Sequence, residues 1–126
     1  MTGGQKVLVV DDETRIREIC REVLELQDYV VMEAENGRKA LEIMRDTSFS
    51  LVLSDIMMPD LGGLELASMI RDLYPDTFVI LITGHGTVDL AKEAIRKGAF
   101  DFIAKPFLPE QLQLTINGCL DLAAAT

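Results

Sequence analysis

The chain has 126 residues, 48% of them hydrophobic and 26% charged, which is enough for one domain with a core of its own. The formal net charge of −9 argues against binding of nucleic acid or of an anionic membrane by this domain. No apolar run approaches the roughly 20 residues that span a bilayer, and no secretory leader is present, so we expect a cytoplasmic protein. We expect a flexible leader at residues 1–5, the folded domain at 6–122, and its C-terminal end or the start of a linker at 123–126.

Taken in chain order, short apolar segments rich in Val, Ile and Leu alternate with stretches of helical periodicity. The apolar segments cover residues 7–10, 30–32, 51–53, 78–82 and 102–104. Most of them are continuous and do not alternate with polar residues. This pattern is typical of strands that are covered on both faces, as in a parallel sheet.

Each apolar segment is followed by hydrophobic residues at the i, i+3, i+4 spacing of an amphipathic helix. These stripes cover residues 16–24, 40–44, 66–73, 88–95 and 112–120, and we expect the first helix at residues 14–27. Five strands alternating with five helices predict one doubly wound α/β domain. Cys20 and Cys119 fall on the apolar faces of the first and last helices, where we expect buried thiols in a reducing compartment.

Polar residues follow four of the five apolar segments. Because the carboxyl ends of parallel strands share one edge of a sheet, where open α/β sheets bind ligands, we expect these side chains to converge. They are Asp11, Asp12 and Glu13 after the first segment, Ser54 and Asp55 after the third, Thr83 after the fourth and Lys105 after the fifth. Glu33 and Ala34, after the second segment, carry no such signal.

Each of these residues also has a simpler interpretation. Asp12 or Thr14 would suit the N-cap of the first helix, Asp55 the cap of the turn after its strand, and Lys105 a solvated surface charge. Taken together, however, three carboxylates in one cleft repel and raise one another's pKa unless a cation joins them. Hard oxygen ligands with room for water suit Mg²⁺, for which Mn²⁺ can substitute.

The same side chains suit phosphoryl transfer, in which positioning and charge neutralisation supply most of the catalysis. Lys105 would meet developing negative charge, and Thr83 would donate a hydrogen bond. A carboxylate is a known nucleophile toward phosphorus and forms an acyl phosphate. Asp55 ends an apolar run, where an isolated carboxylate is costly to bury, and is therefore placed to receive a phosphoryl group.

Four stretches of the sequence carry a resemblance to a known family. VLVVDDE at 7–13, DIMMPDLGGLEL at 55–66, LITGHG at 81–86 and GAFDFIAKPF at 98–107 occur in order and at the family's spacing. The chain resembles the response-regulator receiver domain of bacterial two-component signalling, and the last two stretches are similar to receivers of nitrogen-regulation and nitrogen-fixation class transcription regulators. The resemblance implies a flavodoxin-like fold, with a five-stranded parallel sheet in the order 2-1-3-4-5 and five helices.

The resemblance also implies roles for individual residues. Asp55 corresponds to the phosphoacceptor, and Lys105 to the lysine that pairs with the phosphoryl group. Asp11 and Asp12 match the acidic pair that holds Mg²⁺, with Asp12 the direct ligand and Asp11 acting through water. Asp55 and the backbone carbonyl of Met57 complete the protein ligands.

Four further residues match the family's switch positions and the positions that tune the rate of acyl-phosphate hydrolysis. Thr83 corresponds to the switch hydroxyl and Phe102 to the aromatic switch residue. Met57 and His85 lie two residues past the acceptor and past Thr83, where side chains tune the access of water to the acyl phosphate. Met57 offers no group that orients water, so we expect slow autodephosphorylation. A solvent-facing loop residue is the simpler interpretation of His85.

By this resemblance the domain is a signalling phosphoacceptor and not an enzyme, apart from its own phosphorylation and dephosphorylation. The donor would be a phosphohistidine on a sensor histidine kinase or phosphotransfer protein. Phosphorylation would switch the surface of the fourth helix, fifth strand and fifth helix, acting on an output domain, a partner or a second copy in a homodimer. Transcription regulation is the expected output; the alternative is a stand-alone receiver that serves as a phosphorelay intermediate or interaction switch without DNA-binding output.

Three other classes of protein fit less well. An aspartyl-phosphate phosphohydrolase has a DxD pattern, in which the second Asp acts as the general acid. Here Met57 occupies that position, two residues after Asp55. A scaffold that never takes phosphate usually loses the acceptor, an acidic residue or the lysine, and all are present. A flavodoxin-like nucleotide binder needs a glycine-rich loop after the first strand, where DDE stands.

Overall fold

The chain folds into a parallel sheet with helices on both faces. The computed structural model describes residues 4–84, 88–96 and 98–125, and the strands and helices below are those of these residues. The strands are β1 (Lys6–Val10), β2 (Val30–Ala34), β3 (Leu51–Asp55), β4 (Phe78–Thr83) and β5 (Asp101–Ala104). The helices are α1 (Thr14–Glu25), α2 (Gly37–Asp46), α3 (Gly63–Leu73), α4 (Val88–Arg96) and α5 (Pro109–Ala125).

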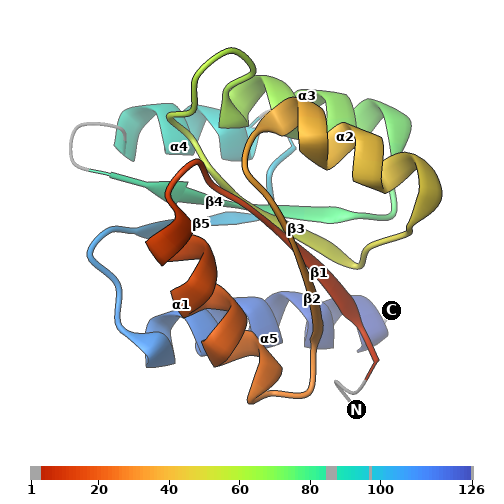
Figure 1. Ribbon diagram of the computed structural model, residues 1–126, viewed down its shortest axis with the longest axis vertical. Coiled ribbons are helices and arrows are strands. Elements are labelled where there is room, and N and C mark those ends of the chain that lie inside the picture. Colours follow the sequence, from red (N-terminus) through yellow and green to blue (C-terminus); the bar gives the residue numbers. More distant parts are fainter. Residues whose placement is uncertain (1–3, 85–87, 97, 126) are drawn as a thin grey trace.

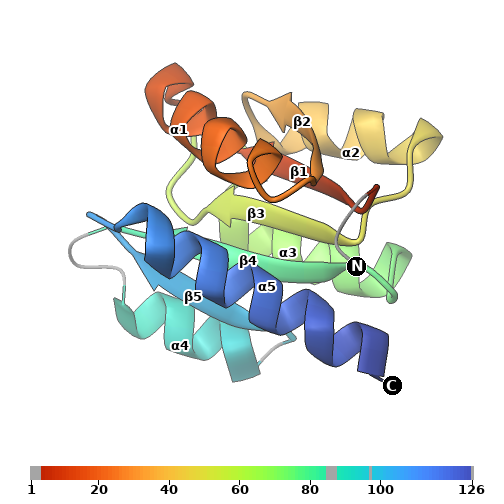
Figure 2. The same ribbon diagram turned by 90° about the horizontal axis from the view of Figure 1, so that it is seen from below.

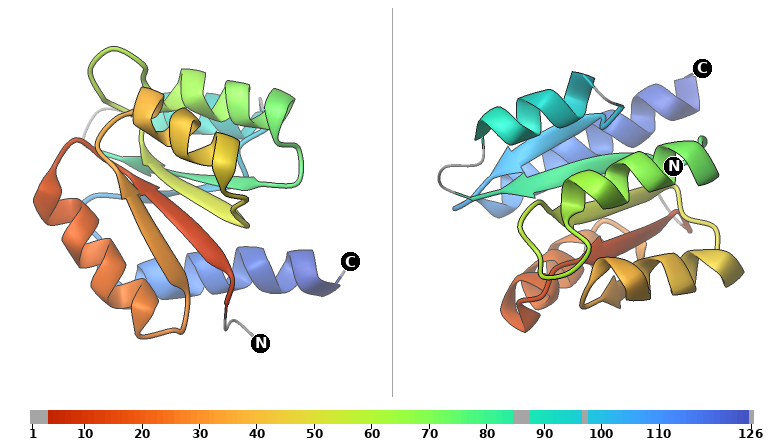
Figure 3. Two further views of the ribbon diagram at one scale, coloured as in Figure 1. Left: turned by 45° about the vertical axis from the view of Figure 1, so that its right-hand side comes forward. Right: turned by 90° about the horizontal axis from the view of Figure 1, so that it is seen from above.

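The five strands pair in the order β2-β1-β3-β4-β5, and every pair is parallel, which confirms the predicted doubly wound fold. Helices α1 and α5 cover one face of the sheet, and α2, α3 and α4 cover the other (Figures 1 and 2). In the described part of the chain, none of the helices combines the length and apolar character that crossing a membrane requires. Because the strands run in one direction, their carboxyl ends share one edge of the sheet (Figure 3).

The observed elements contain every predicted apolar run and helical stripe, but some of them differ from the prediction at their ends. Strand β3 continues through Ser54 and Asp55, and β4 continues through Thr83. These polar residues therefore belong to the strands, and the pleat of the sheet sets the directions of their side chains. Helix α1 ends at Glu25, two residues before the predicted end at residue 27.

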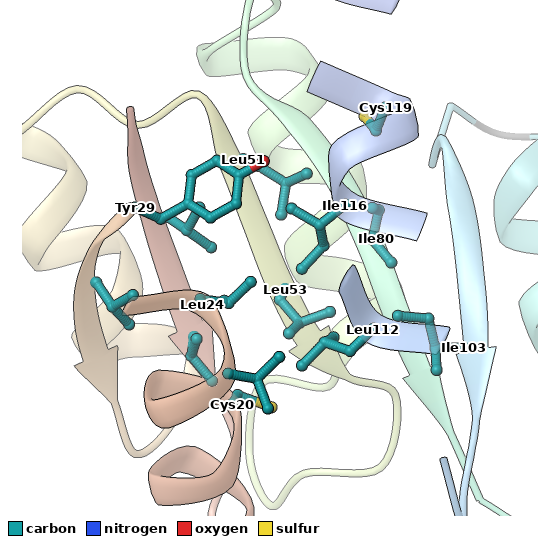
Figure 4. Packing of buried hydrophobic residues seen from close by; sticks show 14 of the residues in the cluster. Cys20, Leu24, Tyr29, Leu51, Leu53, Ile80, Ile103, Leu112, Ile116 and Cys119 are labelled. Carbon is teal, nitrogen blue, oxygen red and sulfur yellow. The ribbon is translucent and has the colours of Figure 1, made fainter. Parts of the chain in front are cut away.

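Two apolar clusters fill the space between the sheet and the helices. Figure 4 shows the cluster under α1 and α5, in which Cys20, Leu24, Leu53, Ile116 and Cys119 pack together. The second cluster lies under α2, α3 and α4. Both cysteines are buried and unpaired, as predicted, and burial raises the pKa of each thiol to about 12. The thiols therefore behave as small hydrophobic side chains at neutral pH.

Candidate functional site

The buried polar side chains of the protein gather at one edge of the sheet. Among the described residues, the buried polar or charged ones are Asp11, Ser54, Asp55 and Thr83. Asp11 directly follows β1, Ser54 and Asp55 end β3, and Thr83 ends β4. The sheet thus brings together side chains from three strands, as the sequence predicts, in a region where an uncompensated polar group is costly.

Asp11 lies where β1 leaves the sheet. Its backbone N–H makes a last sheet bond to the Ala34 carbonyl at 3.2 Å, and its Oδ1 accepts a hydrogen bond from the Glu13 N–H at 2.9 Å. Among the described residues, the buried Oδ2 of Asp11 has no hydrogen-bond donor. The N-cap of α1 is Glu13, and it makes no side-chain cap bond within the described chain, so the simpler interpretation of Asp12 or Thr14 as the N-cap is wrong.

Asp55 is held by the loop and helix that follow it. Its Oδ1 accepts a hydrogen bond from the Met57 N–H at 3.3 Å, so this carboxylate does cap the turn after its strand. The first residue of α3, Gly63, packs directly on the backbone of Asp55, and its N–H donates to the Ile56 carbonyl at 2.9 Å. A Cβ at Gly63 would stand 2.2 Å from the Asp55 carbonyl oxygen, so only glycine fits. The sequence marks Gly63 as a turn residue and does not reveal this contact.

Lys105 brings a positive charge into the same space. Its backbone N–H donates to the Thr83 carbonyl at 2.7 Å, and its peptide bond to Pro106 is cis. Its Nζ lies 3.4 Å from Asp55 Oδ2, 3.6 Å from Glu13 Oε1 and 3.7 Å from Asp11 Oδ2. The side chain is only 22% exposed, so the interpretation of Lys105 as a solvated surface charge is wrong.

The charged groups at this edge of the sheet perturb one another's pKa. Burial raises the pKa of Asp11 to about 6, and the nearby Asp55 and Asp12 add to the effect, whereas the Glu13 N–H and Lys105 oppose it. Burial also raises the pKa of Asp55, although Lys105 acts in the opposite direction. Burial disfavours the Lys105 ammonium, but Asp11, Asp55 and Glu13 outweigh it and hold its pKa above the usual value. One lysine thus faces an excess of negative charge.

The acidic side chains form a cluster that fits a hard cation. Asp11, Asp12, Glu13 and Asp55 each offer a carboxylate oxygen, and these four atoms all lie within 4.8 Å of one another. The donor set consists of hard oxygens, and it includes the buried Asp11 Oδ2, for which a cation would provide a partner. Glu13 was expected at this edge of the sheet, but no ligand role was predicted for it. Its position in the DDE run is the signal that could have suggested one.

The structure describes three of the four predicted switch and tuning residues. Thr83 is buried, and its Oγ1 lies 3.3 Å from the Gly84 carbonyl, to which it donates. Phe102 is half-buried and packs on the core under α2, α3 and α4. Met57 is 62% exposed, so its thioether stands in solvent beside Asp55. The predicted tuning residue His85 lies outside the described residues.

A hollow lies next to the lysine, between α1 and the segment after β5. It has a volume of about 470 Å³ and is lined by Ile16, Ile19, Gly84, Lys105, Pro106 and Phe107. Its walls are mostly apolar, and it adjoins the charged cleft through Lys105.

Comparison with known proteins agrees with this geometry. A family model described as the response regulator receiver domain matches residues 7–117. The chain is 38% identical over 122 residues to the regulatory protein AtoC of Escherichia coli (strain K12), covering 97% of this chain and 26% of that protein. It is 32% identical over 123 residues to the transcriptional regulatory protein SrrA of Staphylococcus aureus (strain NCTC 8325 / PS 47), covering 98% of this chain and 51% of that protein.

A solved structure shows the same fold at similar sequence identity. The crystal structure of the receiver domain of NtrX from Brucella abortus matches with a TM-score of 0.88 and 37% identity, covering 91% of this chain and 98% of that one. The chain spans between about a quarter and a half of the length of AtoC and SrrA. Since the family model covers most of the sequence and the fold agrees with it, the chain belongs to the response regulator receiver domain family, as its motifs predict.

Proposed function

We propose that Asp55 accepts a phosphoryl group from a phosphohistidine on a sensor histidine kinase or phosphotransfer protein. The observation that carries the proposal is the nearly buried Asp55 carboxylate, which is 5% exposed and has a lysine 3.4 Å from one oxygen and an acidic cluster beside it. Burial of a carboxylate costs the fold free energy, and a function for that carboxylate would explain why the cost is tolerated. Nucleophilic attack on phosphorus is the use that the surrounding charges favour.

In the proposed step, a carboxylate oxygen of Asp55 attacks phosphorus while the bond from phosphorus to the donor imidazole nitrogen breaks. The electron pair of that bond stays on the imidazole, and Asp55 becomes an acyl phosphate. Lys105 stands where its ammonium can pair with a phosphoryl oxygen, which adds a charge-assisted hydrogen bond. Hydrolysis by water would return the Asp55 carboxylate and release inorganic phosphate, so the domain's catalysis is confined to its own modification.

We infer that Mg²⁺, or Mn²⁺ in its place, is the cation of this site, held by Asp11, Asp12, Asp55 and the Met57 carbonyl. The buried Asp11 Oδ2, which accepts no hydrogen bond within the described chain, and the hard donor set support this assignment. When bound, the ion neutralises charge on the carboxylates and on the phosphoryl oxygens. Asp12 is exposed and Asp11 is buried; in this proposal Asp12 binds the ion directly and Asp11 acts through water.

Phosphorylation would act on the rest of the domain through Thr83 and Phe102. The phosphoryl oxygens offer Thr83 Oγ1 a charged acceptor in place of the neutral Gly84 carbonyl. Movement of Thr83 would open space for Phe102 to turn further inward. The α4–β5–α5 surface, which carries the exposed Leu90 and Leu114, would then shift between two packings.

This surface would meet an output domain, a partner or a second copy of the chain. AtoC and SrrA are longer proteins with regulatory names, and we propose a transcriptional output on that basis. The alternative is a stand-alone receiver that relays phosphate or binds a partner without a DNA-binding domain.

Intact mass spectrometry after treatment with a small-molecule phosphodonor tests the proposal. We expect one phosphoryl group on the wild type in Mg²⁺, stable in acid and labile in base, much less in EDTA, and none on Asp55→Asn. Asp76→Asn serves as the matched control because Asp76 is exposed and precedes β4, at the opposite edge of the sheet. Equal phosphorylation of wild type and Asp55→Asn would refute the assignment of the acceptor.

A further inference from the structure

Arg17 reaches from α1 back to the acidic loop. Its Nη1 donates to the backbone carbonyl of Asp11 at 2.7 Å, and its Nη2 lies 3.3 Å from Thr14 Oγ1. The Arg17 side chain is only 14% exposed, although it stands in the first turns of a surface helix. This arginine therefore spans the loop that carries the acidic cluster.

Glu33 on the neighbouring strand holds this arginine in place. Glu33 Oε1 accepts from Arg17 Nε at 3.1 Å, and Glu33 Oε2 accepts from Arg21 Nε at 2.6 Å. In the sheet Glu33 is the partner of Val9, two residues before Asp11. Burial disfavours the Glu33 carboxylate, but the two arginines outweigh it and lower its pKa, so the carboxylate stays charged at neutral pH.

The hydrogen bond from Arg17 to the Asp11 carbonyl acts on the backbone of the acidic loop. The sheet bond from the Asp11 N–H to Ala34 is the last one that β1 makes to β2, and beyond it the chain turns toward Glu13. The Asp11 carbonyl and the Asp12 N–H belong to one planar peptide unit. A hydrogen bond that fixes this carbonyl therefore also holds the peptide plane between the two acidic residues. It thereby restrains ψ of Asp11 and φ of Asp12, on which the directions of their Cα–Cβ bonds depend.

We propose that Arg17, held by Glu33, is a positioning residue of the cation site. It orients the Asp11–Asp12 peptide and so sets the affinity of the acidic cluster for a divalent cation. The inference rests on the proposed function of this cluster. Residues that orient metal ligands without touching the metal typically change affinity by roughly ten- to a hundredfold when they are removed.

Arg21 provides a matched control. It lies on the same helix, donates its Nε to the same Glu33 carboxylate, and adds a bond to Glu25 at 3.0 Å. Among the contacts of the described residues, its guanidinium partners are these two glutamates, and only Arg17 reaches Asp11. Loss of positive charge or of helix stability would have the same effect in Arg17→Met and in Arg21→Met. An effect that acts through the Asp11–Asp12 peptide plane would appear in Arg17→Met alone.

The test is a Mg²⁺ titration of the unphosphorylated chain, followed by the backbone amide NMR shifts of Glu13 and Met57. We expect the dissociation constant to rise roughly ten- to a hundredfold in Arg17→Met and to stay within about twofold of wild type in Arg21→Met. The Glu13 amide, which donates to Asp11 Oδ1, should also shift in Arg17→Met in EDTA, before any metal is added. Arg17→Lys should recover part of the affinity, because one ammonium can donate to the Asp11 carbonyl without the second contact to Glu33.

Glu33→Gln keeps Arg17 but removes the negative charge that holds it. This variant replaces Arg17→Met in the test if Arg17→Met does not fold. We expect an intermediate loss of affinity, and the double variant Arg17→Met, Glu33→Gln should bind no more weakly than Arg17→Met alone. Wild-type affinity in both Arg17→Met and Glu33→Gln, or an equal loss in Arg21→Met, would overturn the inference while leaving phosphorylation of Asp55 intact. A wild type that shows no saturable Mg²⁺ binding and no phosphorylation would overturn the proposed function as well.

Discussion

Replacing Asp11 by Asn should make the metal-free domain more stable at neutral pH. Asp11 is fully buried, and its pKa rises from 3.8 to about 6. At about 1.4 kcal/mol per pKa unit, keeping this carboxylate ionised in the fold costs about 3 kcal/mol. Attraction to Lys105 is already contained in that shift. Asn can still accept the Glu13 hydrogen bond, so the substitution removes the charge and keeps the contact.

The stability gained in Asp11→Asn should increase with pH. Because the folded state holds the Asp11 proton more tightly than the unfolded state does, the wild type loses stability as the pH rises from about 4 to about 6. Above the folded pKa the whole penalty is present, and below the unfolded value of 3.8 it is absent. The advantage of Asp11→Asn should therefore be largest at pH 7 and disappear near pH 4.

Thermal melts in EDTA, followed by circular dichroism, measure this advantage. For a domain of this size 3 kcal/mol corresponds to roughly 10 °C in Tm. Asp12→Asn is the control, because Asp12 is exposed and a solvated charge contributes little. Saturating Mg²⁺ should stabilise the wild type more than Asp11→Asn, since the variant lacks one of the carboxylates. A variant that is no more stable at pH 7, or one whose gain persists at pH 4, would refute the reasoning.

Two further predictions concern the residues that flank Asp55. Met57→Asn should shorten the lifetime of the acyl phosphate, because the amide can orient a water beside Asp55 where the exposed thioether cannot; equal rates of phosphate release from wild type and variant would contradict this. Gly63→Ala should cost about 1–3 kcal/mol in urea unfolding, because its Cβ would stand 2.2 Å from a backbone oxygen. Gly62→Ala, whose Cβ would meet its nearest neighbour at an ordinary 3.4 Å, should be tolerated, and equal losses in both variants would show that crowding is not the cause.

The fold was predictable because its signals are local. Continuous apolar runs separated by helical stripes predict a parallel sheet covered on both faces, and the strands contain each predicted run. The convergence of Asp11, Asp55, Thr83 and Lys105 follows from that architecture, because parallel strands end at one edge. The position of each residue directly after a predicted strand was therefore sufficient to predict that they lie together.

The supporting contacts were not predictable in the same way. Glu33 follows a run without a distinctive signal, yet it holds two arginines from α1, 16 and 12 residues earlier in the chain. Gly63 has the composition of a turn, and its close approach to Asp55 depends on how α3 packs against the end of β3. Such contacts depend on side-chain directions and on distances between elements. A pattern of residue types along the chain does not contain either.

The arrangement of the cleft favours function at the expense of stability. Burial raises the pKa of both Asp11 and Asp55, and the single Lys105 does not neutralise the acidic side chains around it. Asn at these positions would remove the cost of the buried charge, but it would also remove the negative charge that attracts a cation and the nucleophile that we assign to Asp55. The free energy that burial and, to a smaller extent, mutual repulsion cost these carboxylates is offset when positive charge joins them. A binding site made in this way gains affinity for the cation from the same buried, crowded charges that weaken the unbound domain.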